Sequence, residues 1–204
     1  MLPMPLRDGT YVAVRPQTRK DRPLLAEFFA GLSPQSRYQR FFTGMPPKLP
    51  KRMLDALADV DGDRHVGIVA VRGGRIVGAA RYLRRAEAPT VADVAFTVAD
   101  EVHGRGLGGL LMRELKAHAG RRGITRFVFE VLATNDPALT VARSLGARLR
   151  RDGTTVEGVI YIDSGADTPS RSNARAMVRR VATQRPSRND CKSDVSALST
   201  GQSR

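Results

Sequence analysis

The sequence predicts a mixed α/β (α+β) domain, and three patterns in the first 162 residues carry that prediction. Short apolar runs and helical patterns follow one another as strand, helices, three strands, helix, strand, helix and two strands. Gly73-Gly74 separates two apolar runs, which is the signature of a tight β-hairpin. A glycine-rich stretch over residues 104–109 joins a strand to a helix.

The N-terminal part is expected to hold one strand and three short helices. Residues 11–15 are predicted as the first strand and residues 20–32 as the first helix. Ser33 and Pro34 predict the start of the second helix, because serine is a favoured cap and proline suits the first helical position. The third helix is expected over residues 50–58.

Three strands are expected in the middle of the chain. The runs 65–71 and 75–83 flank the glycine pair, so we predict that they are antiparallel neighbours. A third run covers residues 91–98. One face of this strand carries Val94, Phe96 and Val98, and the other carries Asp93, Ala95 and Thr97. Asp93 is therefore the polar exception on an apolar strand.

Composition limits the classes of function. Hydrophobic residues make up 41% of the 204 residues, which is enough for one buried core. The single cysteine, Cys191, excludes an intrachain disulfide and a cysteine-based zinc site. The longest nearly apolar stretch, residues 66–71, falls short of the ~18 residues of a membrane span, and the first residues lack a signal-peptide core. We therefore expect a cytoplasmic protein with no membrane partner.

The basic charge has more than one possible meaning. A formal net charge of +14 would attract nucleic acid, an acidic protein face or an anionic cofactor. The charges are spread along the chain, and no aromatic-basic interleaving accompanies them, which disfavours nucleic-acid recognition. A monomer and a dimer are both compatible with the sequence.

The chain divides into a domain over residues 1–162 and a basic tail over residues 163–204. In the tail serine occurs eight times in 42 residues, and the apolar patterns stop, so we expect disorder. Residues 172–183 have helical spacing and could form a short basic docking helix, although isolated helices of this length are marginal in water.

The glycine stretch is the strongest chemical signal. It opens a helix with an apolar stripe formed by Leu107, Leu110, Leu111, Leu115 and Ala119. Free backbone N–H groups and the positive end of a helix dipole meet at such a junction, which is the geometry that binds phosphate. The stretch comes too late in the chain for a dinucleotide fold, and it lacks the Gly-Lys-Ser or Gly-Lys-Thr of a nucleotide-triphosphate loop.

The run His103-Gly104-Arg105-Gly106-Leu107-Gly108 resembles the acyl-CoA signature of the GNAT superfamily of N-acetyltransferases, with His103 in place of Gln or Arg. The strand 127–132 is followed by Asn135-Asp136-Pro137-Ala138-Leu139 and then by Ala142-Arg143-Ser144-Leu145-Gly146-Ala147. This order resembles the second GNAT signature. The resemblance implies a mixed, mostly antiparallel sheet of about six to seven strands flanked by helices, with a V-shaped splay at the acyl-CoA site.

The resemblance also implies acetyl-CoA as co-substrate, with no metal, and a set of contact residues. These are Phe96, Thr97, Val98, His103, Gly104, Arg105, Gly106, Leu107, Gly108, Gly109, Asn135, Ala138 and Ala142. The backbone amide near Val98 would stabilise the oxyanion. Asp93 stands where the family has a glutamate base, although it could equally be an exposed strand residue that limits edge pairing. Glu130 and His65 are alternative bases, and Ala142 stands where many members have a tyrosine acid.

Several further segments resemble one subgroup, the bacterial protein lysine acetyltransferases that act on acyl-CoA synthetases. They are Asp8-Gly9-Thr10, Leu32 to Tyr38 with Arg40-Phe41-Phe42, Asp63 to Val66 and Gly74 to Gly78. The implied acceptor is a protein lysine, and residues 28–42 would form the acceptor wall, with Arg37 and Arg40 as contacts. A GNAT enzyme for a small amine or a protein N-terminus, and a catalytically weak CoA-sensing module, are the alternatives.

Overall fold

The computed structural model of the protein describes residues 3–162, which form one sheet with helices on both sides. The strands are β1 (Pro3–Pro5), β2 (Tyr11–Pro16), β3 (His65–Arg72), β4 (Arg75–Arg84), β5 (Val91–Val98), β6 (Arg126–Leu132), β7 (Arg148–Asp152) and β8 (Thr155–Tyr161). The helices are α1 (Arg22–Ala30), α2 (Pro34–Phe41), α3 (Lys51–Ala58), α4 (Leu107–Gly120) and α5 (Asp136–Ser144), with 3₁₀ turns η1 (Arg19–Asp21) and η2 (Asp100–Val102).

The eight strands lie in the order β1-β2-β3-β4-β5-β6-β8-β7. All neighbours are antiparallel except β5 and β6, which are parallel. This confirms the predicted mixed, mostly antiparallel sheet. The count exceeds the predicted six to seven by β1, a three-residue edge strand with two prolines. Proline lacks the N–H that a ladder needs, so residues 3–5 carry no strand signal, and an edge is where such a strand is tolerated.

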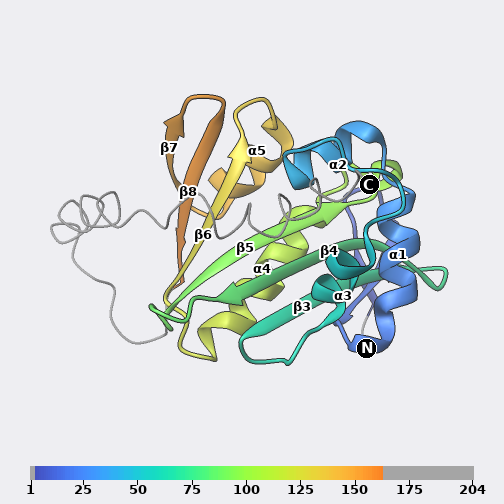
Figure 1. Ribbon diagram of the computed structural model, residues 1–204, viewed down its shortest axis with the longest axis horizontal. Helices are drawn as coiled ribbons and strands as arrows, with labels where there is room; N and C mark the ends of the chain where they lie inside the picture. The colour runs from blue at the N-terminus through green and yellow to red at the C-terminus, as the bar shows by residue number, and fades with distance from the viewer. Residues whose placement is uncertain (1–2, 163–204) are drawn as a thin grey trace, which may run out of the picture. The chain divides into compact units, whose positions relative to one another are not determined.

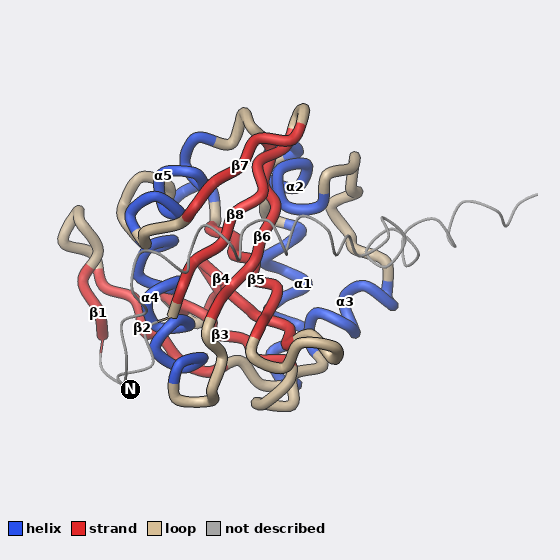
Figure 2. The backbone as a smooth tube through the Cα atoms, turned by 90° about the vertical axis from the view of Figure 1, so that its left-hand side faces the viewer, coloured by secondary structure: helices blue, strands red, loops and turns tan. Residues whose placement is uncertain are grey.

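The helices cover the two faces of the sheet unequally. Figure 2 shows α4 and α5 on one side of the sheet and α1, α2 and α3 on the other. The buried face of α4 carries the predicted stripe of Leu107, Leu110, Leu111, Leu115 and Ala119, all at most 7% exposed. The stripe packs on the middle strands, where the Leu107 and Leu111 side chains lie against Gly78 of β4.

Local sequence signals explain most of the element boundaries. Gly73 and Gly74 both have positive φ, as the predicted two-residue hairpin between β3 and β4 requires. The Ser33 hydroxyl caps α2 by accepting a hydrogen bond from the Ser36 amide. The helix expected over residues 20–32 is instead split into η1 and the shorter α1. Pro23 accounts for the break, because proline is tolerated only in the first turn of a helix.

The predicted tail over residues 163–204, with its candidate docking helix, lies outside the described residues. Within residues 3–162, none of the helices has the length and apolar character needed to cross a membrane.

A close packing contact joins β6 to β8. The ring of Phe129 lies directly over the Cα of Gly158, its neighbour across the strand pair, so a Cβ at position 158 would overlap the ring. We expect Gly158→Ala to lower the free energy of unfolding by about 1–3 kcal/mol, because the ring would have to move in a packed site. Thermal unfolding of Gly158→Ala beside Gly44→Ala measures this.

Gly44 is the matched control because a Cβ there meets nothing within 4 Å and its φ is not in the left-handed region. Adding Phe129→Leu to Gly158→Ala should recover part of the loss, since the smaller side chain makes room. Equal melting temperatures for the two single variants would show that the ring moves without cost.

Candidate active site

The glycine loop lies between the end of β5 and the start of α4. Gly106 is the N-cap of α4 with φ of 84°, and Gly104 also has positive φ, conformations that side chains rarely adopt. Gly108 is needed for space, because a Cβ there would lie 2.9 Å from the Phe96 ring. The first turn of α4 therefore presents bare backbone N–H groups at the positive end of the helix dipole.

The loop is held in place by contacts on both sides. His103 donates from its Nε2 to the Val98 carbonyl over 2.9 Å, which ties the loop to the end of β5. On the other side, Arg105 forms a 2.6 Å ion pair with Asp8 in the turn between β1 and β2. The Arg7 amide also donates to the Arg105 carbonyl over 3.0 Å. The loop geometry is therefore formed by the protein alone.

The sheet opens beside this loop, at the predicted splay. β5 and β6 pair only at Val91, Ala92 and Asp93, and no later residue of β5 pairs with β6. The Ala99 amide donates to the Val77 carbonyl, which fixes the register so that odd-numbered residues of β5 bond to β4. Even-numbered residues therefore direct their backbone groups to the opposite edge. Figure 1 shows β5 and β6 diverging beyond their short contact.

The backbone amides of Phe96 and Val98 consequently face the diverging edge of β5. Their side chains lie on the α4 side of the sheet with Gly78 and Ala80, their partners on β4. Thr97 differs from them in both respects. Its backbone faces β4, and its side chain, 8% exposed, lines a recess on the α1 side.

The recess lies on the α1–α3 side of β4 and β5. Its lining includes Leu25 and Phe29 of α1, Arg40 of α2, Arg81 of β4, and Ala95 and Thr97 of β5. Asp93 lies on the same face as Ala95, two residues earlier, where β5 begins to separate from β6. The recess and the glycine loop are thus on opposite faces of one diverging strand.

Asp93 is paired and accessible. Its carboxylate accepts two hydrogen bonds from Arg85, at 2.9 Å from Nε and 2.7 Å from a terminal nitrogen. The Asp93 side chain is 52% exposed, so this pair sits at the surface. The hydrogen bond to Asp93 raises the pKa of the Arg85 guanidinium, which stays charged. An incoming group can therefore reach the carboxylate.

The N-terminal end of α5 lies beside the splay. Asn135 is the N-cap of α5, and its side-chain oxygen accepts a hydrogen bond from the Ala138 amide over 3.2 Å. Ala142 is 5% exposed on the inner face of the same helix. Val141 reaches towards Gly108, so α5 packs beside the first turn of α4.

The sequence of residues 33–147 matches the acetyltransferase (GNAT) family. The chain belongs to this family. That stretch contains the glycine loop, the splay and the start of α5, so the family match and the site geometry coincide. The protein is therefore a GNAT acetyltransferase, and its eight-stranded open sheet is a GNAT fold.

Three relatives show how closely the chain follows other GNAT proteins. Acetyltransferase Pat of Mycolicibacterium smegmatis is 32% identical over 148 residues, which are 72% of this chain and 44% of that protein. An acetyltransferase of Pseudomonas aeruginosa is 32% identical over 160 residues, 76% of this chain and 85% of the other. The crystal structure of the GNAT domain of S. lividans PAT has a TM-score of 0.74 at 32% identity, covering 78% of this chain and 96% of that one.

The chain thus spans less than half of the M. smegmatis protein but nearly all of the S. lividans GNAT domain. The likeness concerns the GNAT domain, and the activity of a longer relative as a whole does not transfer with it.

The GNAT structure brings together most of the residues that the sequence singled out. His103, the glycine loop, Phe96 and Val98 lie around the end of β5, and Asn135 and Ala138 lie at the start of the neighbouring α5. Thr97 is the exception, because it faces the recess and not the side of the glycine loop.

The two alternative bases occupy different positions on the sheet. Glu130 is exposed on β6 opposite Glu157, beyond the point where β6 leaves β5. His65 lies on β3 opposite Leu83, which in turn lies opposite Asp93. Burial, and secondarily the charge of Arg81, lowers the pKa of His65, whose Nδ1 lies 2.7 Å from the Asp59 carbonyl. His65 is thus two strands away from the splay and already engaged.

The acceptor wall expected over residues 28–42 needs correction at Arg37. Its side chain is 6% exposed and donates to the carbonyls of Leu32 and Met45, so Arg37 holds the loop after α2 and does not face a partner. Phe28 and Phe29 are core residues, whereas Tyr38 and Phe42 are more than 40% exposed. Arg40 lines the recess and keeps the position expected of a contact.

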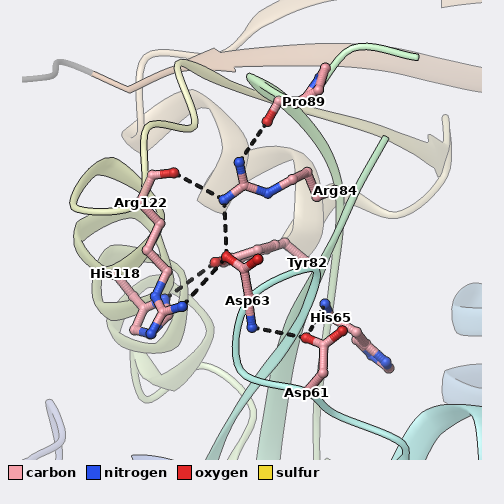
Figure 3. A network of polar contacts seen from close by, with 8 residues as sticks. All are labelled: Asp61, Asp63, His65, Tyr82, Arg84, Pro89, His118 and Arg122. Atoms are coloured by element: carbon pink, nitrogen blue, oxygen red, sulfur yellow. Dashed lines mark hydrogen bonds and ion pairs between the residues drawn. The ribbon is translucent and has the colours of Figure 1, made fainter. Parts of the chain in front are cut away.

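A second polar network lies at the far end of β4. Figure 3 shows Asp63 between the guanidinium groups of Arg84 and Arg122, 3.5 Å from each. Arg84 also donates to the carbonyls of Pro89 and Arg122, over 2.9 Å each. Because Arg84 pairs with the first residues of β5, the network is a strand length away from the glycine loop. It joins the β4–β5 turn to the end of α4, at the same end of β5 as Asp93.

Proposed function

We propose that this GNAT protein transfers the acetyl group of acetyl-CoA to a lysine side chain of another protein, with the active-site lysine of an acyl-CoA synthetase as the first acceptor to test. The observation that carries the proposal is the placement of Asp93. Its carboxylate lies where β5 leaves β6, on the face opposite the glycine loop helix. A thioester and an amine could then approach the same strand from two faces.

The glycine loop supports the proposal that CoA binds on the face of the sheet that α4 covers. CoA carries phosphate groups, and the bare N–H groups of residues 104–109 suit them because the loop is formed without a ligand. The amides of Phe96 and Val98 point from β5 towards the splay, and we assign the Val98 amide to the developing oxyanion. The side-chain NH₂ group of Asn135 would contact the arm of CoA that carries the thioester.

The residues on the recess face of β5 support the proposal that an amine acceptor binds there. Lysine has a pKa of about 10.4, so a base must take its proton before or during attack on the thioester carbonyl. Asp93 is the proposed base. The guanidinium groups of Arg81 and Arg85 lie on the same face, and nearby positive charge favours the neutral form of an incoming amine. The new bond joins the amine nitrogen to the acetyl carbon, and the carbon–sulfur bond breaks as the thiolate leaves.

No side chain at position 142 can protonate that thiolate, because Ala142 has only a methyl group. A thiol with a pKa of about 8.5 can leave as an anion without help from an acid, at some cost in rate. We therefore propose that the reaction proceeds without a general acid at this position.

The experiment that tests the function is an acetylation assay with acetyl-CoA and three acceptors: a purified acyl-CoA synthetase, a panel of small amines and a peptide with a free N-terminus. Mass spectrometry of the products identifies the modified nitrogen. We expect acetylation of one lysine of the synthetase. Transfer only to small amines or to the N-terminus would replace the proposed acceptor, and CoA binding without any transfer would favour a CoA-sensing module.

A further inference from the structure

Helix α2 is held on the protein by a polar face. Of its eight residues, the buried ones are Ser36 and Arg37. Phe41, at the end of the helix, is partly buried and packs on Phe29, with the ring centroids 5.6 Å apart. A helix this short needs contacts with the rest of the protein to form, and α2 buries little apolar area. Its position therefore depends mainly on polar contacts.

The carboxylate of Asp100 receives three of those contacts, all from the N-terminal end of α2. The Ser33 amide donates to it over 2.9 Å, and the hydroxyls of Ser33 and Ser36 donate over 2.8 and 2.7 Å. The Ser33 hydroxyl also accepts from the Ser36 amide as the helix cap, which a hydroxyl can do while it donates. One side chain, 67 positions after Ser33 in the chain, thus holds the start of the helix.

The Asp100 carboxyl is ionised in this setting. Burial would raise its pKa, but the hydrogen bonds from Ser36 and Ser33 outweigh burial and lower the pKa below its ordinary value. Hydrogen bonds to a charged acceptor are stronger than bonds between neutral groups. The three bonds to Asp100 are therefore the strong kind, which suits a contact that replaces apolar packing.

The main chain of Asp100 belongs to the turn that joins β5 to the glycine loop. Val98 ends β5 two residues earlier. The Ala99 amide donates to the Val77 carbonyl over 2.9 Å, which fixes this end of β5 on β4. The Asp100 carbonyl accepts from the His103 amide over 3.2 Å. The backbone of Asp100 is thus fixed on the sheet, and its side chain reaches across to α2.

Helix α2 and strand β5 form two walls of the same recess. Arg40 lines the recess from α2, and Ala95 and Thr97 line it from β5. Asp93, the proposed base, lies on the same face of β5. The bonds to Asp100 therefore determine how the α2 wall stands relative to the strand that carries the base.

We propose that Asp100 is a positioning residue that holds α2 against the end of β5 and so keeps the acceptor side of the recess in place. It acts through Ser33 and Ser36. The inference rests on the proposed function, since it takes the recess face as the acceptor side. Loss of the carboxylate should weaken acceptor binding and spare the CoA side, because His103 and Arg105 hold the glycine loop through separate contacts.

Steady-state acetylation of a purified acyl-CoA synthetase by the full-length Asp100→Asn protein tests the proposal. Asparagine has one acceptor oxygen where aspartate has two, so the donors of α2 lose a partner. We expect the KM for the acceptor to rise roughly tenfold, the loss typical of one hydrogen bond to a charged group. The Kd for acetyl-CoA, measured by isothermal titration, should change little.

Ser36→Ala tests the same contact from the other side. It removes one hydrogen bond to Asp100 and should raise the acceptor KM as well. The double variant Ser36→Ala/Asp100→Asn should be little worse than Asp100→Asn alone, because residues of one hydrogen-bond network are not additive. Glu101→Gln is the matched control, since it removes a carboxylate charge from the next, exposed residue of the same turn.

Hydrogen exchange followed by mass spectrometry gives a readout that needs no acceptor. The amides of α2 should exchange faster in Asp100→Asn, and those of α4 should not. An unchanged acceptor KM, equal protection of α2 in both proteins, or an equal loss of acetyl-CoA affinity would each overturn this inference alone. An unaltered protein that acetylates no acceptor would overturn the proposed function instead, and the exchange rates of α2 would then decide whether Asp100 positions the helix.

Discussion

Replacing Asp93 by asparagine should slow acetyl transfer by roughly 10²–10⁴-fold while leaving the affinity for acetyl-CoA nearly unchanged. Asparagine keeps the size of the side chain but cannot accept the proton of the amine. The carboxylate lies on the recess face of β5, away from the glycine loop, so its loss should not reach the CoA side. Steady-state rates and acetyl-CoA titrations on the same preparation measure both quantities.

Two further variants separate the base from its ion pair. Arg85→Gln removes the partner of Asp93 and leaves the carboxylate, so it should keep most of the rate if the carboxylate is what matters. The stability of this variant should change little, because exposed ion pairs contribute about 0–1 kcal/mol. Asp93→Glu adds one methylene, and we expect it to retain activity because it keeps the base.

An Asp93→Asn protein as fast as the unaltered one would remove Asp93 from the mechanism. The residue would then be a polar strand position held by Arg85, as its 52% exposure also allows. Glu130 would be the next base to test, since it lies on the strand that forms the other side of the splay.

The sequence predicted the central strands and the glycine loop because their signals are local. Gly73 and Gly74 determine the β3–β4 hairpin, and the alternation over residues 91–98 gives the two faces of β5 that the structure shows. The run from His103 to Gly108 predicts the position of the glycine loop because that signal is also local. Each of these features depends on neighbours within a few residues.

Other features depend on contacts between distant segments, which one sequence does not reveal. Arg37 carries a charge and was expected at the surface, yet the carbonyls of Leu32 and Met45 satisfy its donors inside the protein. Arg7 lies against Gly106, 99 positions later, and only the fold brings them together.

The short parallel contact between β5 and β6 makes Phe127 the residue whose loss should cost the most stability. Its ring is 0% exposed and lies 5.8 Å from the ring of Tyr82, centroid to centroid, under α4. Phe127 pairs with Ala92, the middle one of the three pairs that join the two halves of the sheet. Phe127→Ala should therefore lower the free energy of unfolding by about 3–5 kcal/mol, the range for a buried phenylalanine.

For a chain of this size such a loss corresponds to a fall in melting temperature of roughly 6–20 °C. Phe42→Ala is the matched control, because that ring is 41% exposed and its removal leaves no buried cavity. Saturating acetyl-CoA should raise the melting temperature of Phe42→Ala as it does that of the unaltered protein, through preferential binding to the folded state. The rise should be smaller for Phe127→Ala, since the splay depends on the contact that Phe127 supports. A similar loss for both variants would show that this contact does not hold the two halves of the sheet together.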